Sequence, residues 1–370
     1  MTQVAPEPLA MSKDEREPLR KQPKIPDNGC PFYCCGAAAP AIDVNVILRD
    51  GGKYVQNEDG RIVEYFVYGS GSADAKGVML QINGTLGTGY MCANQKLVDA
   101  KLKELNLVGL SITIPGYGYT TMFPVGYKIG DWSKTDVEPV LKAEGLQDKP
   151  LWVEGTSYGA GIALGVASHF GRRVERLHLH APYINAELRK ELGLPEAIGD
   201  DALLARDSAW VNSCGSCWLH CCCSCMFNCC SPSAFDDEDT KRTEAKVPGS
   251  TALTHEDMRR ASRRGINSHG IAHNSVGGVI SKNWGFDVRD IDCSAMKVMI
   301  SYNLNDRNCG SKELLPANPH GEFLAKHFEE KAAGTLVNVG GVADITAPNQ
   351  HAEQFWKALD GTFLGQLSEL

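Results

Sequence analysis

Apolar residues in this chain gather into short runs that are separated by turn residues and by amphipathic segments. Almost continuous apolar runs are typical of strands covered on both faces of a sheet. They occur at residues 77–83, 107–114, 151–154, 174–180, 297–302 and 335–339. Alternating apolar and polar residues, next to Asp-Gly turns, predict two further strands at 44–48 and 61–67.

Helical patterns lie between these predicted strands. Residues 91–105 and 131–145 are expected to form helices, a helix of small residues begins at about 160, and a last helix is expected over 349–360. A strand, loop and helix in repeated succession is typical of a parallel sheet with helices on both faces. The pattern therefore predicts an α/β fold with a mostly parallel central sheet.

The same pattern divides the chain into a core, a tail and an insertion. Residues 1–42 are rich in Pro, Lys, Glu and Asp without periodicity, which predicts a disordered tail. The core occupies residues 43–183 and resumes at 293–370. Residues 184–292 interrupt the alternation between two core strands, which is the usual position of a lid over a site at the C-terminal edge of the sheet.

Composition narrows the range of partners. The chain has 370 residues, 43% of them apolar, which is enough for a large core, and a net charge of −8. This charge disfavours nucleic acid as a partner, because no basic field is present to neutralise phosphates. No apolar run of secretory-signal type begins the sequence, and none reaches the length of about 18 residues that a membrane span needs. We therefore expect a cytoplasmic protein that acts on a small molecule.

Cysteine is unusually frequent, with 14 residues, of which eight lie between Cys214 and Cys230. In a reducing compartment these are free thiols, metal ligands or lipid-attachment sites. The segment 214–230 also contains aromatic and aliphatic residues, so it is compatible with an apolar lid or membrane-interface patch, with S-acylation, or with a thiolate cluster for a soft metal ion. Cys34 and Cys35, beside aromatic residues in the tail, are further candidates for S-acylation and membrane association.

The segment Gly155-Thr156-Ser157-Tyr158-Gly159 carries the main candidate chemistry. It is a G-x-S-x-G pattern that follows a predicted strand and opens a predicted helix, which is the context in which the motif has catalytic meaning. A nucleophile on such a sharp turn needs small residues two positions before and after it. The N-terminus of the helix then directs N–H groups and positive dipole character at a developing oxyanion.

From residue 43 to its end the chain resembles the α/β-hydrolase superfamily, most closely the plant and algal branch of its soluble serine hydrolases. The resemblance depends on four segments taken together, which are much more specific than any one alone. They are Asn83-Gly84-Thr85 in place of His-Gly-x, the turn Pro115-Gly116-Tyr117-Gly118, the elbow at Ser157, and a lid that ends in Asn283-Trp284-Gly285-Phe286-Asp287.

The resemblance implies a role for several residues. Ser157 would be the nucleophile, and the backbone N–H groups of Thr85 and Tyr158 would form the oxyanion hole. Asp306 follows the strand at 297–302, where the family has its catalytic acid. The resemblance also implies the α/β-hydrolase fold, with a Cys-rich lid, and no metal or organic cofactor.

One position departs from the family pattern. The family's histidine follows the last strand, but Val342 stands in its place, and valine cannot accept a proton. His351, nine residues later, is the first candidate for the general base, and His180, at the end of its strand, is the second.

The sequence therefore predicts an esterase- or lipase-like serine hydrolase that forms an acyl-enzyme on Ser157. Two alternatives remain open. One is a catalytically impaired binding protein with the α/β-hydrolase fold, in which the elbow is present but the base is absent. The other is a membrane-surface protein that is held by acylated cysteines.

Overall fold

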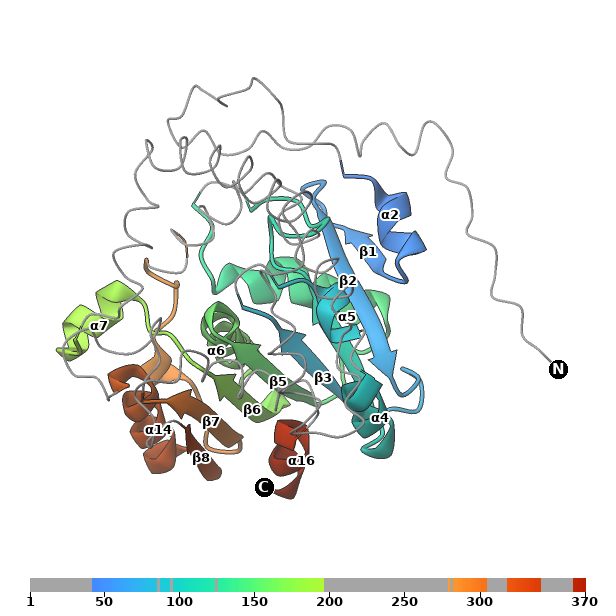
Figure 1. The fold of residues 1–370 in the computed structure, drawn as a ribbon. Coiled ribbons are helices and arrows are strands. Elements are labelled where there is room, and N and C mark those ends of the chain that lie inside the picture. Colours follow the sequence, from blue (N-terminus) through green and yellow to red (C-terminus); the bar gives the residue numbers. More distant parts are fainter. Residues whose placement is uncertain are drawn as a thin grey trace, which may run out of the picture.

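The computed structural model describes residues 42–84, 87–93, 96–123, 126–195, 279, 282–304, 318–340 and 362–370 (Figure 1). Nearly all of the predicted tail and the cysteine-rich segment 214–230 lie outside these residues. The described part includes both ends of the predicted lid, but not residues 196–278, so the lid itself stays a prediction.

A single eight-stranded sheet, in the order β1-β2-β4-β3-β5-β6-β7-β8, forms the centre of the molecule (Figure 1). The strands are β1 Lys53–Gln56, β2 Ile62–Gly69, β3 Gly77–Ile82, β4 Leu107–Ile112, β5 Leu151–Thr156, β6 Val174–His180, β7 Lys297–Asn303 and β8 Gly334–Gly340. Strands β3 to β8 are parallel, while β2 pairs antiparallel with both β1 and β4. The prediction of a mostly parallel sheet is confirmed.

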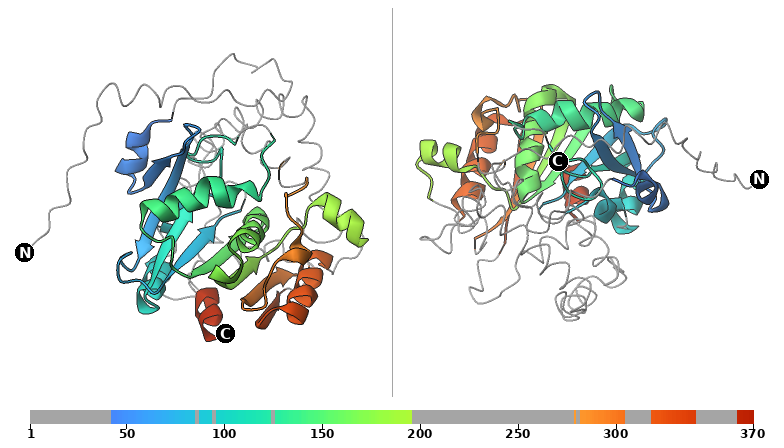
Figure 2. Two further views of the ribbon diagram at one scale, coloured as in Figure 1. Left: turned by 180° about the vertical axis from the view of Figure 1, so that it is seen from behind. Right: turned by 90° about the horizontal axis from the view of Figure 1, so that it is seen from above.

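Helices cover both faces of the sheet (Figure 2). They are α2 Val44–Arg49, α3 Gly89–Ala93, α4 Lys96–Glu104, η1 Ser133–Val137, α5 Glu138–Ala143, α6 Tyr158–Phe170, η2 Gly171–Arg173, α7 Ala186–Leu192, η5 Val288–Asp290, α14 Pro319–Lys331 and α16 Thr362–Glu369. Helices α5, α6 and α14 pack on one face of the sheet, and α3, α4 and α16 on the other. None of these helices is both long and apolar enough to cross a membrane.

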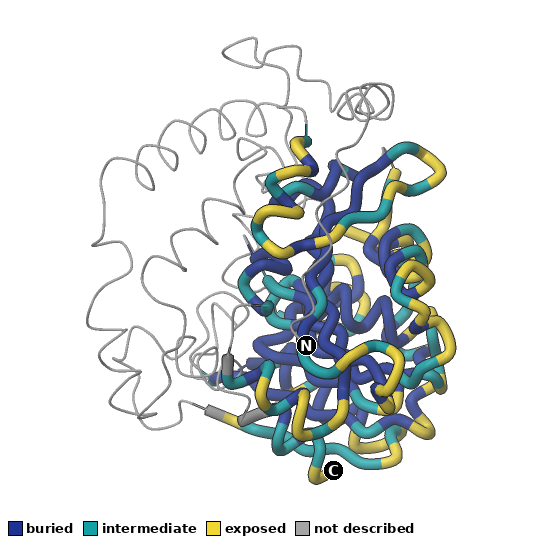
Figure 3. Tube along the Cα trace, turned by 90° about the vertical axis from the view of Figure 1, so that its right-hand side faces the viewer, coloured by how far each residue is buried: buried dark blue, intermediate teal, exposed yellow. Residues whose placement is uncertain are grey.

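The central strands are buried because their apolar side chains point into two separate cores. All residues of β3 and β4 are buried, as the continuous apolar runs predict. Buried residues fill the interior of the described part of the chain (Figure 3). The larger core contains Val78, Leu80 and Val153 with the buried face of α6, and the smaller contains Met79 and Trp152 with α4 and α16. This alternation along each strand is the period of two that a covered sheet requires.

One prediction near the start of the core needs correction. The predicted strand at 44–48 is wrong, since these residues form the short helix α2. Val44 and Ile47 lie three positions apart on the buried side of this helix, where they pack with Ile62, and the Asp43 side chain caps it by accepting a hydrogen bond from the Asn45 N–H at 3.0 Å. The first strand comes later, at β1.

The helix predictions are partly confirmed. The segment 91–105 contains two helices, α3 and α4, and 131–145 contains α5 preceded by the single π-helical turn η1. The helix predicted over 349–360 lies outside the described residues. The hydrophobic pattern did not predict the helices α7, α14 and α16.

Candidate active site

Ser157 lies on a sharp turn between β5 and α6, at the C-terminal edge of the sheet. Its backbone has φ 55° and ψ −119°, a conformation that residues with a side chain adopt only when the surroundings impose it. Ser157 occupies the N-cap position of α6, yet its side chain makes no capping hydrogen bond. A serine at this position ordinarily uses its hydroxyl for the cap. Ser157 as a whole is half-buried, and its hydroxyl is not engaged in the helix cap.

The two glycines of the motif allow the backbone segments to pack closely. A Cβ atom on Gly155 would come within 2.6 Å of the Cβ of Ala163 in α6. A Cβ atom on Gly159 would collide with the backbone oxygen of Ile82, at the end of β3. These distances, 2.6 Å to the Ala163 Cβ and 2.3 Å to the Ile82 oxygen, are shorter than real contacts of a Cβ atom. The requirement for small residues on either side of the serine is confirmed.

Backbone hydrogen bonds fix the elbow to the ends of the two next strands. The Ser157 N–H donates to the carbonyl oxygen of His180 at 2.8 Å, and the Ala181 N–H donates to the carbonyl oxygen of Ser301 at 2.7 Å. Ala181 itself has φ 46°, so the chain turns sharply as it leaves β6. The buried ring of His180 lies on the same side as that of His178, with 5.9 Å between the ring centroids. His180 is thus a backbone neighbour of Ser157.

The loop after β3 begins in direct contact with the elbow. A Cβ atom on Gly84 would come within 2.9 Å of the Ser157 Cβ and of the Thr156 carbonyl oxygen. The Gly87 N–H donates to the Gly84 carbonyl oxygen at 3.0 Å, and the Asn83 side chain donates to the Thr88 carbonyl oxygen at 2.9 Å. Both ends of the loop are therefore held near Ser157, although Thr85 itself lies outside the described residues.

The remaining predicted site residues also lie outside the described residues: the acid candidate Asp306, the base candidate His351, and Val342. The strands that precede them are present. β7 ends at Asn303 and β8 at Gly340, and both run parallel to β5 in the same sheet. Both connecting loops therefore begin at the edge where Ser157 lies, and the assignment of the acid and the base stays a prediction.

A row of buried polar side chains, absent from the sequence prediction, crosses the sheet beneath the elbow. Glu154, three residues before Ser157, accepts a hydrogen bond from the Gln81 amide at 3.0 Å. His178 lies between Glu154 and Ser301, with its Nδ1 3.4 Å from a Glu154 oxygen and its Nε2 3.2 Å from the Ser301 hydroxyl. The row joins four parallel strands. The signal in the sequence was a charged residue inside an otherwise apolar strand.

Tyr68, on β2, extends this row because its hydroxyl donates a hydrogen bond to the side-chain oxygen of Gln81. Burial, together with the neighbouring Cys92 and Glu154, raises the pKa of Tyr68 well above its usual value. Burial also raises the pKa of Cys92 to about 11, so this thiol is neutral at physiological pH. Cys92 is therefore a poor rival nucleophile, because the reactive species is the thiolate.

Cys92 and Cys293 are the free thiols of the described part of the chain. Within the described ranges, no group of three or more His, Cys, Asp or Glu side chains is arranged to hold a metal ion. The interpretations of segment 214–230 as an apolar patch, an acylated segment or a metal cluster stay predictions.

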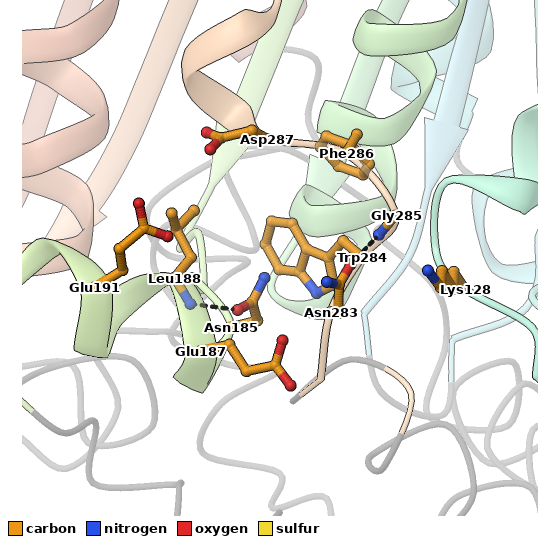
Figure 4. A pocket seen from close by; sticks show the side chains of 10 residues that line it. All are labelled: Lys128, Asn185, Glu187, Leu188, Glu191, Asn283, Trp284, Gly285, Phe286 and Asp287. Atoms are coloured by element: carbon orange, nitrogen blue, oxygen red, sulfur yellow. Dashed lines mark hydrogen bonds between the residues drawn. The ribbon is translucent and has the colours of Figure 1, made fainter.

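A hollow of about 410 Å³ lies where the two ends of the predicted lid meet (Figure 4). Its lining comes from α7 with its N-cap, from the returning segment 283–287 and from one residue that precedes η1. The lining residues are Lys128, Asn185, Glu187, Leu188, Glu191, Asn283, Trp284, Gly285, Phe286 and Asp287. The buried Trp284 lies against α6, within 3.0 Å of where a Cβ on Gly161 would be. Trp284 therefore packs the segment that enters η5 against the helix that begins after Ser157.

The sequence matches no protein-family model and no curated protein sequence. Similarity to solved structures is extensive. For an esterase from Exiguobacterium antarcticum it covers 86% of this chain and 99% of the esterase, with 16% identity and a TM-score of 0.53. For an enol-lactonase from Burkholderia xenovorans it covers 85% of this chain and 100% of the lactonase, with 14% identity and a TM-score of 0.52. For an epoxide hydrolase from Vigna radiata it covers 85% of this chain and 97% of the hydrolase, with 11% identity and a TM-score of 0.51.

At these identities the similarity concerns the fold and not the reaction. The strand order, the antiparallel β2 and the elbow between β5 and α6 agree with it over most of the chain. The chain therefore has the α/β-hydrolase fold.

Proposed function

We propose that the protein is a serine hydrolase that cleaves an ester or related acyl bond through an acyl-enzyme on Ser157. The observation that carries the proposal is the elbow: a serine with φ 55°, at the start of a 13-residue helix, whose hydroxyl is not used for the helix cap. Such strain is retained where surrounding structure imposes it, and it gathers at functional sites.

In the proposed reaction the Ser157 Oγ attacks the carbonyl carbon of the substrate while a base accepts its proton. The oxyanion that develops would be bound by the N–H groups of Tyr158 and Thr85, with support from the positive end of α6. The intermediate then expels the alcohol, which takes the proton from the base. Water attacks the acyl ester on Ser157 in the same manner and releases the acid.

His351 is the first candidate for the base and Asp306 for the acid that orients it. His180 is the alternative base, which is supported by the hydrogen bond between its carbonyl oxygen and the Ser157 N–H. The two histidines reach the site from different elements, so single substitutions can distinguish them.

An acyl substrate is supported by the kind of nucleophile. A serine on an elbow forms acyl esters, and acyl transfer needs no cofactor. Two of the similar structures belong to an esterase and an enol-lactonase, which are described by their names as acting on ester bonds, although the epoxide hydrolase shows that the fold alone does not select the reaction.

Labelling with a fluorophosphonate probe tests the proposal, because such a probe reacts with a serine that is activated by a base and an oxyanion hole. We expect labelling of the parent protein and its loss in Ser157→Ala. Ser168→Ala is the matched control, since Ser168 is an exposed serine on the same helix.

The base is assigned by labelling His351→Ala and His180→Ala, with the exposed His169→Ala as control. Loss in one of the first two variants identifies the base. Absence of labelling in the parent protein, or labelling that persists in Ser157→Ala, would contradict the proposal and favour a binding protein with the base missing at Val342.

A further inference from the structure

A buried carboxylate lies behind the loop that follows β3. Glu64, on β2, has 0% of its surface exposed. One of its oxygens, Oε2, accepts hydrogen bonds from the Thr113 hydroxyl at 2.8 Å and from the Tyr119 N–H at 3.2 Å. Thr113 directly follows β4, and Tyr119 lies in the next turn. Glu64 therefore joins the antiparallel edge of the sheet to the segment that leaves β4.

Thr113 extends this connection to the loop beside the nucleophile. Its hydroxyl oxygen accepts a hydrogen bond from the Gly89 N–H at 3.0 Å, while its hydroxyl hydrogen is donated to Glu64. Because the carboxylate oxygen takes the hydrogen, a lone pair of the hydroxyl oxygen is directed at Gly89. Gly89 is the last residue of the segment Gly84–Gly89, whose first residue touches Ser157.

We propose that Glu64 is a positioning residue for the loop that follows β3, acting through Thr113 on Gly89 at the end of that loop. The elbow holds one end of this segment at Gly84, and the pair Glu64–Thr113 holds the other end at Gly89. Thr85, the proposed second donor to the oxyanion, belongs to this loop in the sequence. This inference rests on the proposed function of Ser157.

The turn after β4 is shaped around the same carboxylate. Gly118 has φ 52°, and a Cβ atom there would collide with the Glu64 Oε2. The glycine is thus required both by its backbone conformation and by the close approach of Glu64. This explains the second glycine of the segment Pro115–Gly118, which the sequence identified only through its resemblance.

The test compares two buried threonines whose hydroxyl groups each accept a backbone hydrogen bond. Thr113→Val removes the acceptor for the Gly89 N–H and the donor to Glu64. Thr121→Val removes the acceptor for the Ile62 N–H, a buried bond of 2.9 Å that joins β2 to the turn after β4 and does not reach the loop. Thr113→Ser keeps the hydroxyl, and Glu64→Gln keeps the shape without the charge. For each variant, kcat and KM for a p-nitrophenyl ester, the rate of fluorophosphonate labelling, and Tm are measured.

Loss of one oxyanion donor lowers kcat by about 100- to 1,000-fold, and a displaced donor should cost less. We therefore expect Thr113→Val to lower kcat and the labelling rate by about 10- to 100-fold with KM nearly unchanged. Thr113→Ser and Thr121→Val should stay within about threefold of the parent. Glu64→Gln should lie between these, because its hydrogen bond to Thr113 loses the assistance of charge. Equal losses in Thr113→Val and Thr121→Val, or no loss in either, would overturn the proposal.

Amide hydrogen exchange at Gly89 separates this inference from the proposed function. Thr113→Val should accelerate exchange at Gly89 while Thr121→Val leaves it unchanged, whether or not Ser157 reacts with the probe. If the parent protein is not labelled but Gly89 exchange responds as expected, the proposed function fails and the anchor stands. If Gly89 exchange is the same in all variants, the anchor is wrong.

Discussion

Replacing Glu154 by alanine should destabilise the fold more than any exposed substitution on the neighbouring strand. The Glu154 carboxylate lies in the buried polar row beneath the elbow and bonds to Gln81 on one side and to His178 on the other. Removing it leaves two buried polar groups without this acceptor. The outcome depends on burial, because an exposed group would exchange the lost bond for water.

The magnitude follows from these two contacts. A buried donor or acceptor that loses its partner costs about 1–3 kcal/mol, so the Gln81 amide and the His178 ring together give about 2–6 kcal/mol. The cavity left by the removed atoms adds to this value. Glu154→Gln should cost only about 1 kcal/mol, since the amide offers one acceptor and one donor of nearly the same shape.

Urea unfolding, followed by tryptophan fluorescence and circular dichroism, measures these differences. Glu175→Ala is the matched control, because Glu175 is an exposed glutamate at the start of the adjacent strand β6, and a surface change of this kind stays within about 0.5 kcal/mol. A loss below about 1 kcal/mol for Glu154→Ala would refute the reasoning, since it would mean that water or other groups replace the carboxylate without cost.

Three further outcomes are expected. Asp136→Ala should lower the free energy of unfolding by about 3–5 kcal/mol, because it leaves Arg61 buried without its buried partner. Asp59→Ala removes a half-exposed partner of Arg61 and should cost about 1 kcal/mol or less in the same urea titration. Burial lowers the pKa of His327 below its usual 6.5, so its contribution to stability is complete above pH 6.5 and is lost as the pH falls from there toward its folded pKa. Between pH 8 and 5 the Tm of His327→Phe should therefore fall less than the Tm of the parent protein. An unchanged pH dependence of Tm would contradict this. Gly155→Ala should cost about 1–3 kcal/mol through overpacking against α6 and should abolish fluorophosphonate labelling; full labelling would show that the elbow tolerates the extra methyl group.

The sheet and the elbow could be predicted because their signals are local. A strand covered on both faces must be apolar along its length, so each run of β-branched and aliphatic residues identifies a parallel strand by itself. The elbow needs glycines two residues on either side of Ser157, and all of its determinants lie within five residues of sequence. Both predictions required no knowledge of which segments meet in space.

The same local reasoning failed where a short pattern is ambiguous. Residues 44–48 alternate well enough for a strand, but only the packing of Val44 and Ile47 against Ile62 shows that the segment is helical. Helices α7, α14 and α16 are similarly decided by the surfaces they cover. The acid and base candidates Asp306 and His351 follow from the resemblance and stay predictions.

By itself the sequence determined the order of the parallel strands along the chain and the serine on its elbow. Only the tertiary structure decided which buried polar groups meet near the C-terminal edge of the sheet. Glu64 reaches Gly89 through Thr113, and Glu154 reaches Ser301 through His178, across strands that are far apart in sequence. A hydrogen bond depends on positions within about 3 Å, and such positions are set by the pairing of the whole sheet and not by any single segment.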